Sequence, residues 1–264
     1  MTNLTLVLGA TGKTGRRLIE RLGERGLAVR AGSRSATPPF DWDDRSTWAP
    51  ALDGASAAYI SYFPDLAVPG AAGTVGDFAR LAVESGVRRL VLLSGRGEPE
   101  AQRAEQLVQT SGAAWTIVRC SWFAQNFSES FLADPVAAGE VYFPAQGVRE
   151  PFVDAEDVAD VAAAALAEDG HEGRLYELTG PRLLTFPEAV EEIARATGRE
   201  IRYVPVSVED FAAGMEGEPE EVVSLVTYLV TEVLDGRNER LANGVREALG
   251  REPRDFAEYA EALR

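Results

Sequence analysis

Lysine is nearly missing from this chain of 264 residues, and the only one is Lys13. Because Lys13 already belongs to a glycine-rich turn, the chain cannot form a Tyr-x-x-x-Lys pair, in which a lysine lowers the pKa of a tyrosine for proton transfer. Either the chemistry of this protein works without that acid, or a bound cofactor serves something other than turnover.

Cysteine and histidine occur once each, as Cys120 and His171. One cysteine excludes an intrachain disulfide framework, and no His/Cys cluster with metal-ligand spacing surrounds the histidine, so we expect no metal site. His171 lies in the acidic turn 168–173, which predicts a solvated loop residue. Cys120 has no adjacent His base, so we interpret it as a small buried filler rather than a reactive thiol.

Clustered positive charge and long apolar runs are also missing. The formal net charge is −16 and the pI is about 4.6, which opposes nucleic-acid binding because phosphate contacts need a cationic surface. No apolar stretch is long enough to cross a bilayer, and no basic leader follows Met1. We therefore expect a cytoplasmic protein without nucleic-acid or membrane partners.

A strand, a glycine turn and a helix open the chain. Residues 4–8 form an apolar run, and the segment Gly9-Ala10-Thr11-Gly12-Lys13-Thr14-Gly15 leads into a helical pattern with Leu18, Ile19 and Leu22 on one face. Glycines let the backbone approach a pyrophosphate, and the helix N-terminus offers unpaired N–H groups and a partial positive charge. A dinucleotide is therefore the predicted ligand.

Apolar runs alternate with amphipathic segments up to about residue 120. Runs at 27–31, 57–60, 90–93 and 115–118 predict further strands. The alternation indicates an α/β fold, a doubly wound parallel Rossmann sheet with a small, mostly helical C-terminal substrate subdomain. The predicted domains are 1–150, mainly nucleotide-binding, and 151–264, mainly the subdomain, with some strands and helices returning to the Rossmann core. Thr185-Phe186-Pro187-Glu188 predicts a capping box, and Gly198 the end of that helix.

The residues after the second predicted strand bear on the choice of cofactor. A site for NAD(H) usually places Asp or Glu there, to hold the ribose 2′-hydroxyl. This chain has Ser33-Arg34-Ser35, and a guanidinium can stack on adenine and pair with a 2′-phosphate. NADP(H) is therefore favoured over NAD(H); the alternative is that Arg34 is a solvated loop arginine.

Separate motifs follow one another in order over nearly the whole chain. They are Gly9-Ala10-Thr11-Gly12, Ser111-Gly112 with Thr116-Ile117-Val118-Arg119, Trp122-Phe123 with Asn126, Pro151-Phe152-Val153-Asp154-x-x-Asp157-Val158-Ala159, and Leu178-Thr179-Gly180-Pro181. Together they resemble the NmrA-like branch of the atypical short-chain dehydrogenase/reductases. Members of that branch include NADPH-dependent quinone and dye reductases, other small-molecule reductases, and redox-sensing regulators that bind the cofactor without turnover, and they commonly lack the full Tyr/Lys dyad.

The resemblance implies roles for residues along the cofactor. Those that would wrap the pyrophosphate are Gly9, Thr11, Gly12, Lys13, Thr14 and Gly15. Arg34 would meet the 2′-phosphate, and Ser61-Tyr62-Phe63 would border the adenosine and the nicotinamide ribose. Ser94 ends the strand on which usual relatives place a catalytic serine. The downstream dyad positions fall among Gly97, Glu98, Ala101 and Gln102, without Tyr or Lys.

The missing acid limits the class of acceptor. Reducing an isolated ketone creates a basic alkoxide, and losing a positioned acid costs rate on the order of 10²–10⁴-fold. A quinone, cationic dye or conjugated acceptor delocalises or cancels the charge that hydride delivers, and it can take protons from water or a nearby hydroxyl. We therefore expect an activated, aromatic or conjugated small molecule as substrate.

An aromatic segment follows the strand at 115–118, at the carboxyl edge where open α/β sheets bind ligands. Trp122, Phe123 and Phe127 predict a flat apolar wall for an aromatic acceptor, with Asn126 donating a hydrogen bond. The alternative is that these side chains seal the junction between sheet and subdomain. The sequence does not identify a catalytic group; its candidates are Ser94 and Asn126.

Two functions follow from these patterns. The first is an NADPH-dependent oxidoreductase that transfers hydride to a quinone-like or conjugated small molecule. The second is a redox-sensing regulator that binds NAD(P) and a protein partner without turnover, which the missing Tyr/Lys pair motivates. An isomerase or lyase that uses the cofactor as a scaffold is a third possibility.

Overall fold

The structure, a computed structural model, describes residues 4–264, so the first three residues of the predicted domain 1–150 lie outside the described range. Contacts divide the chain into two compact units, each assembled from three segments. The first, which we call the sheet unit, comprises the chain up to Cys120 with residues 155–178 and 243–251. The second unit comprises residues 121–154, 179–242 and 252–264.

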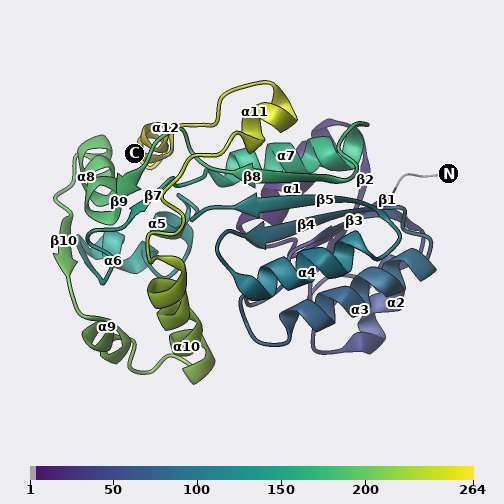
Figure 1. Ribbon diagram of the computed structural model, residues 1–264, viewed down its shortest axis with the longest axis horizontal. Coiled ribbons are helices and arrows are strands. Elements are labelled where there is room, and N and C mark those ends of the chain that lie inside the picture. The colour runs from purple at the N-terminus through teal and green to yellow at the C-terminus, as the bar shows by residue number, and fades with distance from the viewer. Residues whose placement is uncertain (1–3) are drawn as a thin grey trace. The chain divides into compact units, whose positions relative to one another are not determined.

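The sheet unit contains a six-stranded sheet in the order β2-β1-β3-β4-β5-β8, in which all neighbouring strands run parallel (Figure 1). The strands are β1 Leu4–Leu8, β2 Ala28–Gly32, β3 Ala55–Ile60, β4 Arg89–Gly95, β5 Ala114–Cys120 and β8 Arg174–Leu178. The helical segments are α1 Lys13–Glu24, η1 Arg45–Thr47, α2 Trp48–Leu52, α3 Ala71–Glu84, α4 Pro99–Gln109, α7 Ala155–Ala167 and α11 Gly244–Leu249. The predicted parallel Rossmann sheet is confirmed.

Helices cover both faces of the sheet, with α3 beside α4 and α1 beside α7 (Figure 1). Because both faces are covered, the central strands are mostly apolar, and Leu6, Val7 and Leu8 of β1 are fully buried. The strand order reverses between β1 and β3, which gives the sheet a switch point at their carboxyl ends. Ligands of open α/β sheets bind in the crevice at such a point.

The second unit packs short elements around a phenylalanine core that includes Phe127, Phe143, Phe152, Phe186 and Phe256. Its strands are β6 Glu140–Phe143, β7 Arg149–Glu150, β9 Leu184–Thr185 and β10 Arg202–Pro205. They pair as β6 with β10, parallel, and β7 with β9, antiparallel. Its helical segments are α5 Asn126–Glu129, α6 Ala133–Ala138, α8 Phe186–Thr197, α9 Val208–Gly214, α10 Glu220–Tyr228, η2 Leu229–Val233 and α12 Phe256–Glu261.

The start and end of α8 match the sequence prediction. The Thr185 hydroxyl accepts a hydrogen bond from the Glu188 N–H at 3.2 Å, and the Glu188 carboxylate accepts one from the Thr185 N–H at 2.7 Å. Gly198 ends the helix with φ +67°, in the left-handed region. The predicted capping box and terminator are therefore confirmed. Within residues 4–264, no helix combines the length and apolar character needed to cross a membrane.

The single cysteine and the single histidine are both buried. Cys120 is buried as predicted, and burial also raises the pKa of its thiol. The prediction of a solvated His171 is wrong: the residue is 8% exposed, and its Nδ1 lies 2.9 Å from the Tyr176 hydroxyl. The turn is held against the sheet because Thr116 of β5 donates a hydrogen bond to the His171 carbonyl at 2.7 Å.

Burial lowers the pKa of His171 below its ordinary value of 6.5. Because the chain has one histidine, a single imidazole resonance followed by NMR against pH reports this residue alone. We expect its midpoint below 6.5 in the folded protein and near 6.5 in urea. The stability it contributes is complete above that unfolded value and is lost as the pH falls through the folded pKa. A folded midpoint at or above the value in urea would contradict the burial described here.

Candidate active site

The turn from Gly9 to Gly15 joins β1 to α1 at the carboxyl edge of the sheet, beside the switch point. Gly9 has φ +65°, and its carbonyl accepts a hydrogen bond from the Gly12 N–H at 2.9 Å. A Cβ on Gly15 would overlap the Gly9 carbonyl oxygen and lie 2.7 Å from its carbonyl carbon. The turn therefore needs glycine where the helix meets the loop, and it leaves backbone exposed to a ligand.

Helix α1 begins within this segment, at Lys13 after the N-cap Gly12, and has no acidic residue in its first turn. The first N–H groups of an α-helix have no acceptor within the helix, and they carry its positive dipole end. Ion pairs to α7 fix the helix, from Arg17 Nε to Glu156 at 2.6 Å and from Arg21 Nε to Asp160 at 2.8 Å. This cradle of glycines and N–H groups fits a pyrophosphate.

The predicted phosphate-binding residues differ in where their side chains lie. Thr11 is exposed and Lys13 is half-buried, so both side chains reach the surface. Thr14 is buried, and its hydroxyl oxygen lies 2.9 Å from the Tyr59 hydroxyl inside the sheet unit. The Thr14 hydroxyl thus accepts a hydrogen bond from Tyr59, and this buried side chain differs from those of Thr11 and Lys13, which reach the surface.

The segment after β3 lies against the glycine turn. A Cβ on Gly9 would come within 3.1 Å of the Ser61 Cβ, so the two loops are in near contact. Trp42 holds the segment from the other side, because its indole N–H donates to the Ser61 carbonyl at 3.3 Å and its ring lies 4.9 Å from that of Tyr62. The structure thus places Ser61, one of the predicted cofactor-binding residues, next to Gly9 of the glycine turn.

Arg34 follows β2 on the same edge of the sheet. Its guanidinium carbon lies 6.0 Å from the centre of the Phe63 ring, and both side chains are exposed. Ser33 and Ser35 flank the arginine, with 3.3 Å between their hydroxyl oxygens. A guanidinium, an aromatic face and two hydroxyls are the groups that recognise an adenosine phosphate.

Ser94, a predicted catalytic candidate, ends β4 but is 4% exposed. Its hydroxyl donates to a Glu105 carboxylate oxygen at 2.6 Å. The same carboxylate accepts from Arg119, whose Nε lies 2.8 Å away, and Arg119 also pairs with Glu177 at 3.1 Å. The Ser94 hydroxyl proton is therefore used in a hydrogen bond to the buried Glu105 side chain. Ser94 belongs to a network with Glu105 and Arg119.

From the sequence, Glu98 was considered only as a dyad position that lacks Tyr or Lys. No functional role was predicted for the Glu98 carboxyl group. The residue directly precedes α4 and is 8% exposed. A Cβ on Gly95 would overlap both carboxylate oxygens, so the carboxyl group lies over the glycine. Burial, then the charges of Asp65 and Glu105, raise the pKa of Glu98 well above its usual 4.5. The sequence signal for this carboxyl group was a glutamate in the short segment between a strand and the helix that follows it.

The predicted acceptor wall belongs to the second unit. Trp122 and Phe123 are half-buried, and the Trp122 ring lies 5.8 Å from that of Phe186. Asn126 is half-buried, and its side-chain amide forms no hydrogen bond with another residue of the described range. Phe127 exposes none of its surface and packs in the phenylalanine core. Trp122, Phe123 and Asn126 are therefore accessible enough to contact a substrate. Phe127 is not, because it is buried in the phenylalanine core.

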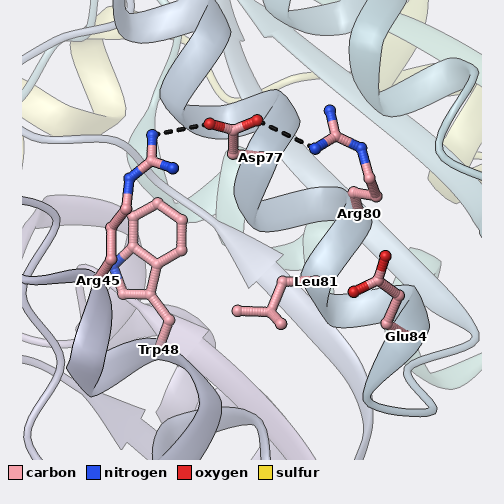
Figure 2. Close-up of a pocket in the computed structure, with 6 residues that line it drawn as sticks. All are labelled: Arg45, Trp48, Asp77, Arg80, Leu81 and Glu84. Carbon is pink, nitrogen blue, oxygen red and sulfur yellow. Dashed lines mark hydrogen bonds and ion pairs between the residues drawn. The ribbon is translucent and has the colours of Figure 1, made fainter.

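Two hollows of the sheet unit lie away from this site. Figure 2 shows the first, about 230 Å³, where Asp77 bridges Arg45 at 2.7 Å and Arg80 at 3.2 Å. The second, about 370 Å³, is lined by residues at the amino ends of strands, among them Thr5 and Ala114. Neither contains a residue of the glycine turn, so neither is the candidate site.

A family model described as NAD(P)H-binding matches residues 9–169, which is more than half of the chain. The chain belongs to this NAD(P)H-binding family. The matched range begins at the first glycine of the turn and includes Arg34, Ser61 and Glu98. The predicted NAD(P)-binding family is thereby confirmed, and a solved structure of NmrA, a negative transcriptional regulator, shares the fold with a TM-score of 0.72 at 18% identity, covering 100% of this chain and 96% of that one.

Relatives of this NAD(P)H-binding chain include an NAD(P)H azoreductase from Xenophilus azovorans, 30% identical over 98% of this chain and 97% of the relative. A (4-alkanoyl-5-oxo-2,5-dihydrofuran-3-yl)methyl phosphate reductase from Streptomyces griseus is 31% identical over 98% and 99%. A solved NADPH-dependent quinone oxidoreductase from Escherichia coli, complexed with NADPH, has a TM-score of 0.81 at 22% identity, covering 98% and 99%. The family is thus one of NAD(P)H-dependent oxidoreductases.

Proposed function

We propose that this protein is an NADPH-dependent oxidoreductase that reduces a quinone-like or conjugated small molecule without a Tyr-x-x-x-Lys dyad. The observation that carries the proposal is the cradle formed by Gly9, Gly15 and the start of α1 at the switch point of the sheet. Bound NADPH supplies a hydride to the acceptor. The backbone of the cradle binds the pyrophosphate, and Ser61 keeps the turn in place from β3.

The acceptor class rests on the chemistry that the chain can support. The azoreductase name specifies an N=N acceptor, and the dihydrofuran name specifies a C=C bond conjugated with two carbonyl groups. Both kinds of acceptor spread the charge that arrives with hydride. A chain with Lys13 as its only lysine, and therefore without the Tyr/Lys acid, is suited to acceptors of this kind.

Three residues of the second unit are proposed to contact the acceptor, Trp122, Phe123 and Asn126. The indole N–H of Trp122 is buried and has no acceptor among the described residues, and a donor left in that state costs about 1–3 kcal/mol. An oxygen or nitrogen of the substrate would satisfy it. The rings supply an apolar face, and the Asn126 amide supplies a further donor.

Arg34 is proposed to select NADPH by pairing with its 2′-phosphate. Replacing Arg34 with alanine is expected to weaken NADPH binding by about 10–100-fold, since hydrogen bonds to charged groups contribute about 1.5–3 kcal/mol, and to leave NADH binding unchanged. Calorimetric titration with each cofactor measures both affinities. Arg80→Ala is the matched control, because it removes an exposed arginine from the sheet unit away from the turn. Equal losses for NADPH and NADH would contradict the assignment.

The function is tested with purified protein, NADPH and a panel of quinones, azo compounds, cationic dyes and conjugated enones. Oxidation of NADPH that depends on the acceptor, followed by absorbance, is the expected result. Tight NADPH binding without turnover of any acceptor would overturn the proposal. A much higher affinity for one redox form of the cofactor would then favour the regulator instead.

A further inference from the structure

We propose that Glu98 is the proton donor of this site, and that its neutral carboxyl group protonates the acceptor as hydride arrives. The inference rests on the proposed function. It assigns a catalytic role to a residue that occupies one of the positions where usual relatives carry the dyad. The acid would thus come from the segment between β4 and α4, at the same edge of the sheet as the glycine turn.

The first support is the position and isolation of the Glu98 carboxyl group. The side chain is 8% exposed, and it forms no hydrogen bond or ion pair with another residue in the part of the chain that the structure describes. Although Glu98 occupies the N-cap position of α4, its side chain accepts no N–H of that helix. A largely buried carboxyl group without a hydrogen-bond donor has a raised pKa, and groups with perturbed pKa values are concentrated at functional sites.

The second support is a contrast with Glu105, which is also buried. Glu105 accepts hydrogen bonds from the Ser94 hydroxyl and from Arg119. Glu98 has neither partner and lies over Gly95, where a side chain would exclude it. Two largely buried carboxyl groups of one unit thus have opposite environments, since one has hydrogen-bond donors and the other has none among the described residues.

The charged and titratable groups around Glu98 also favour its neutral form. Asp65 and Glu105 act on it as like charges, and Cys120 faces it from the end of β5. One nearby cation is directed elsewhere, because Arg119 pairs with Glu105 and Glu177. Lys13 and Arg96 act on the neighbouring Asp65 and on the Cys120 thiol, and burial nonetheless raises the pKa of both groups.

The proposed step balances for a neutral quinone. Hydride brings two electrons and one hydrogen and leaves the acceptor as an anion. The O–H bond of Glu98 breaks, a new O–H bond forms on the acceptor oxygen, and the carboxylate regains a proton from water before the next turnover. A cationic triphenylmethane dye differs, because hydride forms a C–H bond and cancels the positive charge. Its reduction needs no proton.

This difference provides the test, with Glu98→Gln as the variant and Glu84→Gln, an exposed change on α3, as the matched control. Glu98→Gln is expected to lower kcat for benzoquinone by about 10²-fold, the lower end of what a general acid contributes, and to leave reduction of crystal violet unchanged. Wild-type quinone reduction should fall as the pH rises through the raised pKa of Glu98, whereas the variant should show no such fall. An equal loss on both acceptors, or no loss on either, would overturn the proposal.

Infrared difference spectra of wild type minus Glu98→Gln, recorded without cofactor, keep this inference separate from the proposed function. At neutral pH we expect the C=O band of a neutral carboxylic acid in the wild type, and its loss as the pH is raised. If neither acceptor is reduced by the wild type, the proposed function fails, and the spectra still decide the state of Glu98. No neutral-acid band at neutral pH would overturn the assignment whatever the activity.

Discussion

Replacing Gly15 with alanine is expected to weaken NADPH binding by at least about 10²-fold, the cost of misplacing a binding group by roughly 1 Å. The new Cβ would overlap the Gly9 carbonyl oxygen and lie 3.0 Å from the Ala10 Cα. All of these atoms are backbone, so no side chain can rotate away. Either the turn or α1 must shift, and the N–H groups that face the pyrophosphate shift with it.

Gly23→Ala is the matched control for this change, because it introduces the same methyl group near the other end of α1. No atom lies within 4 Å of a Cβ at Gly23. We expect it to leave NADPH binding unchanged and to stabilise the helix by about 0.5–1 kcal/mol. Calorimetry measures the affinities and urea denaturation the stabilities. Normal NADPH binding by folded Gly15→Ala protein would place the pyrophosphate away from this turn.

The glycine turn could be predicted from the sequence because its residues are close together in the chain. The apolar strand, the glycines and the amphipathic helix all lie within residues 4–24, so one short segment contains both the pattern and its geometry. The capping box of α8 was predictable for the same reason, since Thr185 and Glu188 are three residues apart. Short-range patterns of this kind specify elements without knowledge of the tertiary fold.

Contacts between distant segments were not predictable in this way. Strand β8 joins the sheet beside β5 from far along the chain and brings Glu177 to Arg119. The same pairing explains the error at His171, whose turn looks solvated in the sequence and becomes buried when β8 docks. Phe127 is similar: its aromatic character suits a ligand wall or a core equally well, and only its neighbours decide between them.

Glu98 lies between these two cases. Its position after a strand and before a helix was evident in the sequence, and so was the lack of Tyr or Lys nearby. What the sequence could not reveal is that Gly95 makes room for the carboxyl group and that Arg119 is directed to Glu105 instead. The environment of a titratable group depends on every element that packs against it, and here the loop after β3, helix α4 and strands β4 and β5 all contribute.

Replacing Glu105 with leucine is expected to destabilise the protein by about 2–4 kcal/mol, because removing one partner of a buried pair leaves the other charge uncompensated. The Glu105 side chain is 3% exposed and the Arg119 side chain 18%. Ser94 would lose its acceptor as well. The expected loss is below the full cost of an orphaned charge because Arg119 keeps Glu177 at 3.1 Å.

Urea denaturation of Glu105→Leu against the wild type measures this effect as a shift of the midpoint. Arg103→Ala is the control on the same helix, since it breaks an exposed pair with Glu100 in which the arginine is 71% exposed. Such surface pairs contribute little, so we expect a change below about 0.5 kcal/mol. If both variants unfold at the same urea concentration as the wild type, the Ser94–Glu105–Arg119 network does not stabilise the carboxyl edge of the sheet. A large loss confined to Glu105→Leu would show that the fold depends on the hydrogen bonds that the buried Glu105 side chain accepts from Ser94 and Arg119.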